Sequence, residues 1–140
     1  MKQNFLQGAG QHRAWVIFSG QADLRWLRIL KPGFRHCFVV INDGQCWVSY
    51  DPMSHHTDIT VHHVPAFFDL PGWLAGRGHK VVETVIDKTS NKAAPLAIFS
   101  CVEAVKRVLG IHQRGVITPW QLYRYLTRKN NKTEKGDYHG

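Results

Sequence analysis

The stretch from residue 34 to residue 51 runs FRHCFVVINDGQCWVSYD and carries the strongest structural signal in the chain. Its two halves, residues 34–42 and 45–51, are rich in Val, Ile, Phe, Trp and Tyr, which favour strands. Between them stands Asp43-Gly44, a dipeptide typical of a two-residue hairpin loop. The sequence therefore predicts an antiparallel hairpin that turns at Asp43 and Gly44.

The register of this hairpin predicts a histidine–aspartate pair. With a two-residue loop Asn42 faces Gln45, and counting outward in antiparallel pairs places His36 opposite Asp51. Opposed side chains share one face, with Cβ atoms about 4.5 to 5.5 Å apart. The Asp51 carboxylate is then placed to accept a hydrogen bond from the imidazole and to fix its orientation.

Two of the three cysteines fall on the other face of the same hairpin. By this register Cys37 pairs with Tyr50 and Cys46 with Ile41, several rungs apart. We therefore expect that Cys37 and Cys46 neither bond to each other nor take part in chemistry. An odd number of widely spaced cysteines also argues against a disulfide framework and a four-thiolate zinc site.

The third cysteine, Cys101, stands where a helix is predicted to begin. Ser100 as N-cap and Glu103 three residues later form a capping-box pattern, which makes Cys101 the first helical residue. The positive end of the helix dipole and a nearby imidazolium lower the pKa of a thiol there, and the free N–H groups of the first turn suit an oxyanion. A lone cysteine or a lone strand histidine is more often a core residue, so the prediction depends on Cys101, His36 and Asp51 occurring together.

The remaining pattern predicts an α+β fold with a central antiparallel sheet. Residues 13–18, 58–64 and 79–87 are predicted strands; residues 22–30 and 71–75 have helical patterns, and further helices are predicted over residues 101–109 and from Thr118 onward. Strands in the middle with helices at both ends favour α+β. We expect one domain over residues 1–127 and a polar, flexible tail over residues 128–140.

The order of these pieces resembles that of a known superfamily. The pieces are residues 33–40 (GFRHCFVV), 47–51 (WVSYD), 99–105 (FSCVEAV) and 118–122 (TPWQL). A strand-borne histidine, a polar residue on the next strand and a later helix-start cysteine resemble the circularly permuted branch of the NlpC/P60 papain-like cysteine hydrolases. That branch includes the YiiX/YebB-like hydrolases and the lecithin retinol acyltransferase-like enzymes.

This resemblance covers about residues 13–126 and implies a reaction. It implies a papain-like fold and hydrolysis or acyl transfer at a peptide, amide or ester through an acyl-enzyme on Cys101, with His36 as base and Asp51 as orienter. No cofactor is implied. No signal peptide or cell-wall-binding module is recognised in the sequence. We therefore expect the thiol chemistry without assigning a peptidoglycan substrate, and we expect a cytoplasmic location.

Several alternatives remain open from the sequence. A bend after Pro52 would bring His55 or His56 to the place of Asp51. The pairs His55-His56 and His62-His63 invite a zinc interpretation, but adjacent strand residues point to opposite faces and no matching ligand set accompanies them, so no metal is predicted.

A different class of function follows from the net charge of +8 over 140 residues. A non-catalytic binding or assembly module on the same fold would use a basic surface, with exposed aromatics such as Trp73 and Trp120, to hold an anionic partner. Nucleic-acid binding as the main role would need a contiguous basic face. The small size and the charge are also compatible with a bacteriophage-derived or accessory protein.

Overall fold

The structure is a computed structural model and describes residues 12–20, 31–53, 56–87 and 100–136. Within these residues the order of elements is β1 (His12–Ser19), β2 (His36–Asn42), β3 (Trp47–Pro52), β4 (Thr57–His62), α1 (Leu70–Gly76), β5 (Lys80–Ile86), α2 (Cys101–Leu109) and α3 (Pro119–Gly136). The α+β class and the elements predicted at these places are confirmed, with shifted ends. The helix predicted over residues 22–30 lies outside the described residues.

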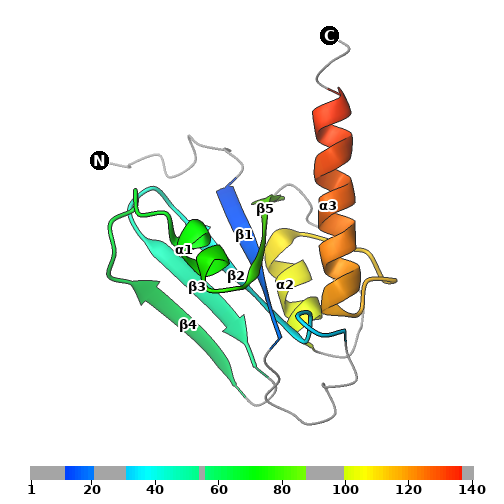
Figure 1. Cartoon of the computed structure of the whole chain (residues 1–140), viewed down its shortest axis with the longest axis horizontal. Helices are drawn as coiled ribbons and strands as arrows, with labels where there is room; N and C mark the ends of the chain where they lie inside the picture. The colour runs from blue at the N-terminus through cyan, green and yellow to red at the C-terminus, as the bar shows by residue number, and fades with distance from the viewer. Residues whose placement is uncertain (1–11, 21–30, 54–55, 88–99, 137–140) are drawn as a thin grey trace, which may run out of the picture.

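The strands form one antiparallel sheet in the order β4-β3-β2-β1-β5 (Figure 1). β1 lies between β2 and β5, and its residues from Ala14 to Ser19 are all buried. An uninterrupted apolar run suits such a strand, because side chains on both of its faces are covered. The sequence RAWVIF therefore places β1 inside the sheet rather than at an edge.

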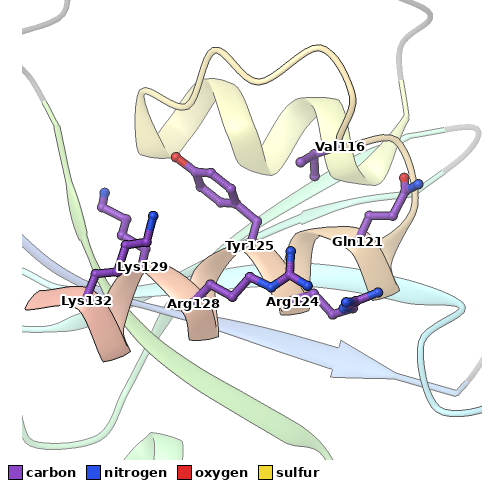
Figure 2. Close-up of a pocket in the computed structure, with 7 residues that line it drawn as sticks. All are labelled: Val116, Gln121, Arg124, Tyr125, Arg128, Lys129 and Lys132. Carbon is purple, nitrogen blue, oxygen red and sulfur yellow. The ribbon is translucent and has the colours of Figure 1, made fainter.

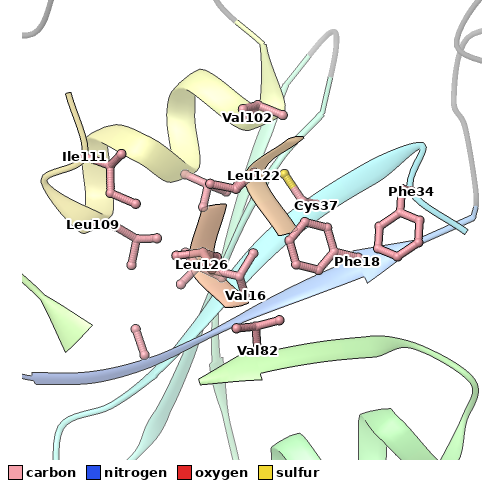
Figure 3. Packing of buried hydrophobic residues seen from close by; sticks show 13 residues of the cluster. Val16, Phe18, Phe34, Cys37, Val82, Val102, Leu109, Ile111, Leu122 and Leu126 are labelled. Atoms are coloured by element: carbon pink, nitrogen blue, oxygen red, sulfur yellow. The ribbon is translucent and has the colours of Figure 1, made fainter. Parts of the chain in front are cut away.

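The two faces of the sheet carry two separate cores. On one face Val16, Phe18 and Cys37 pack with residues of α2 and α3 (Figure 3). On the other face Ile17 and Val40 pack with Leu70 of α1. Alternation along β1 and β2 produces this division, since successive strand residues point to opposite faces.

The loop of the β2–β3 hairpin corrects the predicted register. The ladder pairs Asn42 with Trp47 and Val39 with Tyr50, so residues 43–46 form a four-residue loop, not a two-residue one. The Asp43 carboxylate causes the difference, because its Oδ1 accepts from the backbone N–H groups of Gln45 and Cys46, each at 2.8 Å. Relative to the prediction, β3 is therefore displaced by two residues.

The predicted N-cap of α2 at Ser100 is confirmed, whereas the Glu103 carboxylate, expected to complete the capping box, pairs with Lys106 and Arg107. The Ser100 hydroxyl accepts from the N–H of Glu103 at 3.2 Å, and Gly110 ends the helix with a φ of 73°, in the left-handed region. A Cβ at Gly110 would also lie 2.4 Å from the Asp87 carbonyl oxygen, so only glycine fits there. Cys101 is the first residue of the helix, as predicted.

The last helix is longer than the sequence pattern predicts. Thr118 and Gln121 form a reciprocal cap, with the Thr118 N–H donating to Gln121 Oε1 at 3.0 Å and the Gln121 N–H donating to Thr118 Oγ1 at 3.3 Å. α3 then continues to Gly136, through residues that the sequence assigns to a flexible tail. The segment contains no proline or internal glycine, and Asn130 Nδ2 donates to the Glu83 carbonyl at 2.9 Å, which holds the helix against β5.

Candidate functional site

Three segments far apart in the sequence meet at one end of the sheet. They are the start of β2 with His36, the end of β3 with Asp51, and the start of α2 with Cys101, all toward the lower end of the sheet in Figure 1. The antiparallel hairpin brings the first two together, and α2, packed across β2, supplies the third. The predicted triad residues are therefore neighbours in space.

His36 and Asp51 form a direct hydrogen bond despite the corrected register. The Nε2–H of His36 donates to Asp51 Oδ1 over 2.6 Å, and the two side chains are only 16% and 24% exposed. A displacement of two residues leaves both side chains on the same face and makes them diagonal rather than opposite neighbours. Because Nε2 is held by the carboxylate, Nδ1 is the ring nitrogen left for the thiol.

His36 also hydrogen-bonds to Cys101, so the pKa values of these two groups depend on each other. Burial alone would lower the pKa of His36, but hydrogen bonds to Asp51 and then to Cys101 outweigh it and raise that pKa to about 10. The pKa of Cys101 falls to about 5, because hydrogen bonds from the Cys37 thiol and from His36 outweigh the opposing effect of burial. At neutral pH the site therefore holds a thiolate beside an imidazolium.

Cys37 is the residue that the sequence reasoning missed. It is fully buried, and both its thiol and its backbone N–H hydrogen-bond to the Cys101 sulfur. Burial and the adjacent Cys101 raise the pKa of Cys37 well above its ordinary value, so Cys37 stays protonated and donates. The sequence did not predict this contact of Cys37 with Cys101. Its face was predicted correctly, but the start of α2 lies close enough to the start of β2 for residues on both faces of the strand to reach Cys101.

Cys46 belongs to the loop rather than to a strand, so its predicted pairing with Ile41 is also wrong. Its sulfur lies 3.7 Å from Asp43 Oδ2. Desolvation and the negative charge of Asp43 raise the pKa of Cys46. The chain thus contains one activated thiol and, in Cys46, an exposed-loop thiol of ordinary or lower reactivity for comparison.

The first turn of α2 offers backbone donors next to Cys101. The Ser100 hydroxyl accepts a hydrogen bond from the N–H of Glu103, and the Ser100 carbonyl accepts one from the N–H of Ala104. The N–H groups of Cys101 and Val102 belong to the set that an α-helix leaves without intrahelical partners. They are placed to stabilise negative charge on an oxygen bonded to a carbon attacked by Cys101.

An apolar pocket of about 500 Å³ begins on the same face as His36. The Phe38 ring lies 6.4 Å from the His36 ring, nearly parallel to it, and forms one wall of the pocket. Trp73 and Leu74 of α1 also line the pocket. Its polar lining residues are His62 and Ser49, which hydrogen-bond to each other at 2.9 Å. The pocket therefore offers an apolar binding surface next to the histidine.

A second surface feature is basic and contains none of the triad residues. A groove of about 450 Å³ along α3 is lined by Arg124, Arg128, Lys129, Lys132, Tyr125, Gln121 and Val116 (Figure 2). Four of these seven side chains are cationic, which gives the contiguous basic face that anion binding requires.

The two tryptophans proposed for binding differ in exposure. Trp73 is 49% exposed. Trp120 is not an exposed aromatic, since it packs against Phe34 at a ring distance of 4.9 Å and lies beneath the Lys31 ammonium at 3.6 Å. It belongs to the core between α3 and the sheet.

The other sequence candidates lie elsewhere. His56 pairs with Asp58 at 3.4 Å rather than with His36, and His55 lies outside the described residues. Within the described ranges no three His, Cys, Asp or Glu side chains are grouped so that they could hold a metal ion. None of the helices in the same ranges has both the length and the apolar run needed to span a bilayer.

Comparison of the chain with protein-family models, with curated proteins and with solved structures finds no match in any of the three.

Proposed function

We propose that the protein is a cysteine hydrolase or acyl transferase of papain-like architecture, with Cys101 as nucleophile, His36 as acid and base, and Asp51 as the residue that orients His36. The single observation that carries the proposal is the buried arrangement of Cys101, His36 and Asp51, with the pKa of the thiol lowered to about 5. Perturbed pKa values of this size are typical of reactive sites.

The reaction follows from the protonation states. The Cys101 thiolate attacks the carbonyl carbon of an amide or ester, and the oxyanion accepts hydrogen bonds from the N–H groups at the start of α2. The His36 imidazolium gives its proton to the leaving amine or alcohol as the thioester forms. Neutral His36 then takes a proton from water or another acceptor, which releases the acid or the transferred acyl product and restores the ion pair.

The apolar pocket beside Phe38 supports a substrate with an apolar group next to the scissile bond. Its lining is aromatic and aliphatic apart from Ser49 and His62. Small-molecule sites are commonly of this kind, mostly apolar with few polar groups. Esters and peptides with an apolar acyl portion are therefore the first substrates to screen.

The proposal is tested by the pH dependence of cysteine alkylation, read by mass spectrometry with iodoacetamide. We expect Cys101 to react down to about pH 5, and Cys46 in the same molecule to react only at alkaline pH, as an internal control. In His36→Ala, Cys101 alkylation at pH 6 should slow roughly ten- to thirtyfold. The hydrogen bonds from Cys37 remain in this variant, so the thiolate fraction of Cys101 falls only part of the way toward that of an ordinary thiol. A Cys101 that alkylates like Cys46 at every pH contradicts the proposal.

The basic groove along α3 supports a second function, binding of a nucleic acid. Arg124, Arg128, Lys129 and Lys132 would contact phosphates, and Tyr125 lies among them as a surface on which a base can stack. Such binding weakens steeply with salt, with a slope that falls by about one for each phosphate contact removed.

Fluorescence anisotropy with single-stranded DNA tests this function at several salt concentrations. We expect Arg128→Gln and Lys132→Gln each to lower the salt slope, whereas Lys135→Gln, on the same helix but outside the groove, serves as the matched control. Binding that is absent at low salt, or that is equally reduced by all three substitutions, argues against the groove.

A further inference from the structure

The buried thiol of Cys37 neither attacks the substrate nor transfers a proton in the proposed acyl-transfer steps, although it donates a hydrogen bond to the Cys101 sulfur. Cys37 is 0% exposed and belongs to the core cluster on which Cys101 packs. In Figure 3 its sulfur points toward the first turn of α2, beside Val102. A hydrogen bond joins its thiol to the Cys101 sulfur, so the two sulfur atoms are direct neighbours.

We propose that Cys37 and Cys101 are a peroxide-responsive thiol pair, in which oxidation of the nucleophile is captured as an intramolecular disulfide. The inference uses the reactive thiolate of the proposed function but not its hydrolytic activity. Cys101 is the partner that meets the oxidant first, because Cys37 is closed to solvent whereas Cys101 is partly exposed.

The chemistry balances with hydrogen peroxide as oxidant. The Cys101 thiolate attacks one peroxide oxygen, which gives a sulfenic acid on Cys101 and a hydroxide that takes a proton from the His36 imidazolium and leaves as water. The Cys37 thiol then attacks the Cys101 sulfur and the S–O bond breaks. The leaving hydroxide takes the Cys37 proton as a second water. Two thiols and one peroxide become one disulfide and two waters.

The first step also prepares the second. The negative charge of Cys101 is one of the causes that hold the pKa of Cys37 high, and sulfenic acid formation removes this charge. Cys37 is therefore easier to deprotonate once its neighbour is oxidised. The resulting bond blocks the nucleophile and protects it from further oxidation, and a dithiol reductant restores both thiols.

The test uses the Cys46→Ser variant, in which Cys37 and Cys101 are the only cysteines of the chain. After brief peroxide treatment we expect an intact protein that has lost two hydrogen atoms, remains a monomer under denaturing conditions, and yields a crosslinked Cys37–Cys101 peptide. Dithiothreitol should restore the original mass and the alkylation rate of Cys101. Sulfinic acid on Cys101 with Cys37 still a free thiol would overturn the proposal.

A second variant, Cys37→Val, removes the thiol that captures the sulfenic acid and replaces it with an apolar side chain. In this variant peroxide should oxidise Cys101 more slowly, because a hydrogen bond that lowers the pKa of Cys101 is lost, and should add two oxygen atoms that dithiothreitol does not remove. All readouts are masses and alkylation rates, so they do not depend on finding a substrate. If Cys101 of the parent protein alkylates quickly but never forms the disulfide, the result is consistent with the proposed hydrolase function and overturns the proposed thiol pair.

Discussion

At the scale of single residues, Asp51 is the side chain whose contribution is most sharply defined by geometry. Its Oδ1 lies 2.6 Å from His36 Nε2, and this hydrogen bond is the largest of the causes that raise the pKa of His36 to about 10. Removing the carboxylate leaves the ring without its orienting partner and without the charge that stabilises the imidazolium.

We therefore predict that Asp51→Asn lowers the pKa of His36 and that Asp51→Ala lowers it further, as measured by NMR titration of the imidazole. Acyl-transfer activity should fall about 10- to 100-fold, a part of the ~10²–10⁴ that general acid–base catalysis supplies. Asp58→Asn is the matched control, since Asp58 pairs with Asp51 across β3 and β4 but contacts His56. Equal effects of Asp58→Asn and Asp51→Asn would contradict the assignment.

At the scale of elements, α2 contains a buried ion pair between Glu103 and Lys106, close to Cys101 along the helix. Lys106 Nζ lies 3.1 Å from both Glu103 Oε2 and the Val116 carbonyl oxygen, and the charged side chains are 3% and 7% exposed. Breaking a buried pair from one side leaves an uncompensated charge, whereas replacing both partners by apolar residues is often close to neutral.

Glu103 keeps a second partner in Lys106→Met, because Arg107 Nε lies 3.5 Å from Glu103 Oε1. Lys106→Met should therefore lower the free energy of unfolding, measured by urea denaturation, by less than the ~3–5 kcal/mol expected for a buried charge left without any partner. The double variant Glu103→Leu/Lys106→Met should recover most of this loss and should keep fast alkylation of Cys101. If the double variant is as unstable as the single one, packing volume rather than charge holds α2 in place.

Among the elements, the helix caps follow from the local sequence, whereas the register of the β2–β3 hairpin does not. The N-terminal caps of α2 and α3 were predictable because each depends on two residues only three positions apart, Ser100 with Glu103 and Thr118 with Gln121. The hairpin register was not, because the Asp43 carboxylate captures two backbone N–H groups and lengthens the loop. The face shared by His36 and Asp51 was nevertheless predicted correctly, since a displacement by two preserves the alternation of a strand.

The contact of Cys37 with Cys101 could not be predicted at that scale. Periodicity gives the face of a strand but not where along the strand a packed helix begins. Only the placement of α2 against β2 shows that the start of the helix reaches the first residues of the strand. Tertiary packing of this kind carries no local sequence pattern.

At the scale of the whole molecule, the coupled pair links the site to stability. The folded protein has a His36 pKa of about 10 against an ordinary 6.5, and a Cys101 pKa of about 5 against an ordinary 9.0. The contribution of His36 to the free energy of unfolding is complete below pH 6.5 and is lost as the pH rises to about 10. The cysteine contribution is complete above pH 9.0 and is lost as the pH falls to about 5.

The contributions of His36 and Cys101 together predict a plateau in the free energy of unfolding as a function of pH. The free energy of unfolding due to the pair should rise between about pH 5 and 6.5, stay level to pH 9.0, and fall toward pH 10. Each sloping limb corresponds to one proton, or about 1.4 kcal/mol per pH unit. Urea unfolding of the parent minus that of His36→Gln/Cys101→Ala isolates the pair from other groups. A difference that does not change with pH would show that no ion pair forms.

The meeting of three distant segments at the end of the sheet also turns the site into a natural reporter of folding. His36 and Asp51 are 15 residues apart and come together with the hairpin, but Cys101 arrives only when α2 docks on the completed sheet. Contacts between such distant segments form late when loop closure limits the rate. The time at which Cys101 becomes reactive after dilution from denaturant therefore measures docking of this helix, with no label added to the chain.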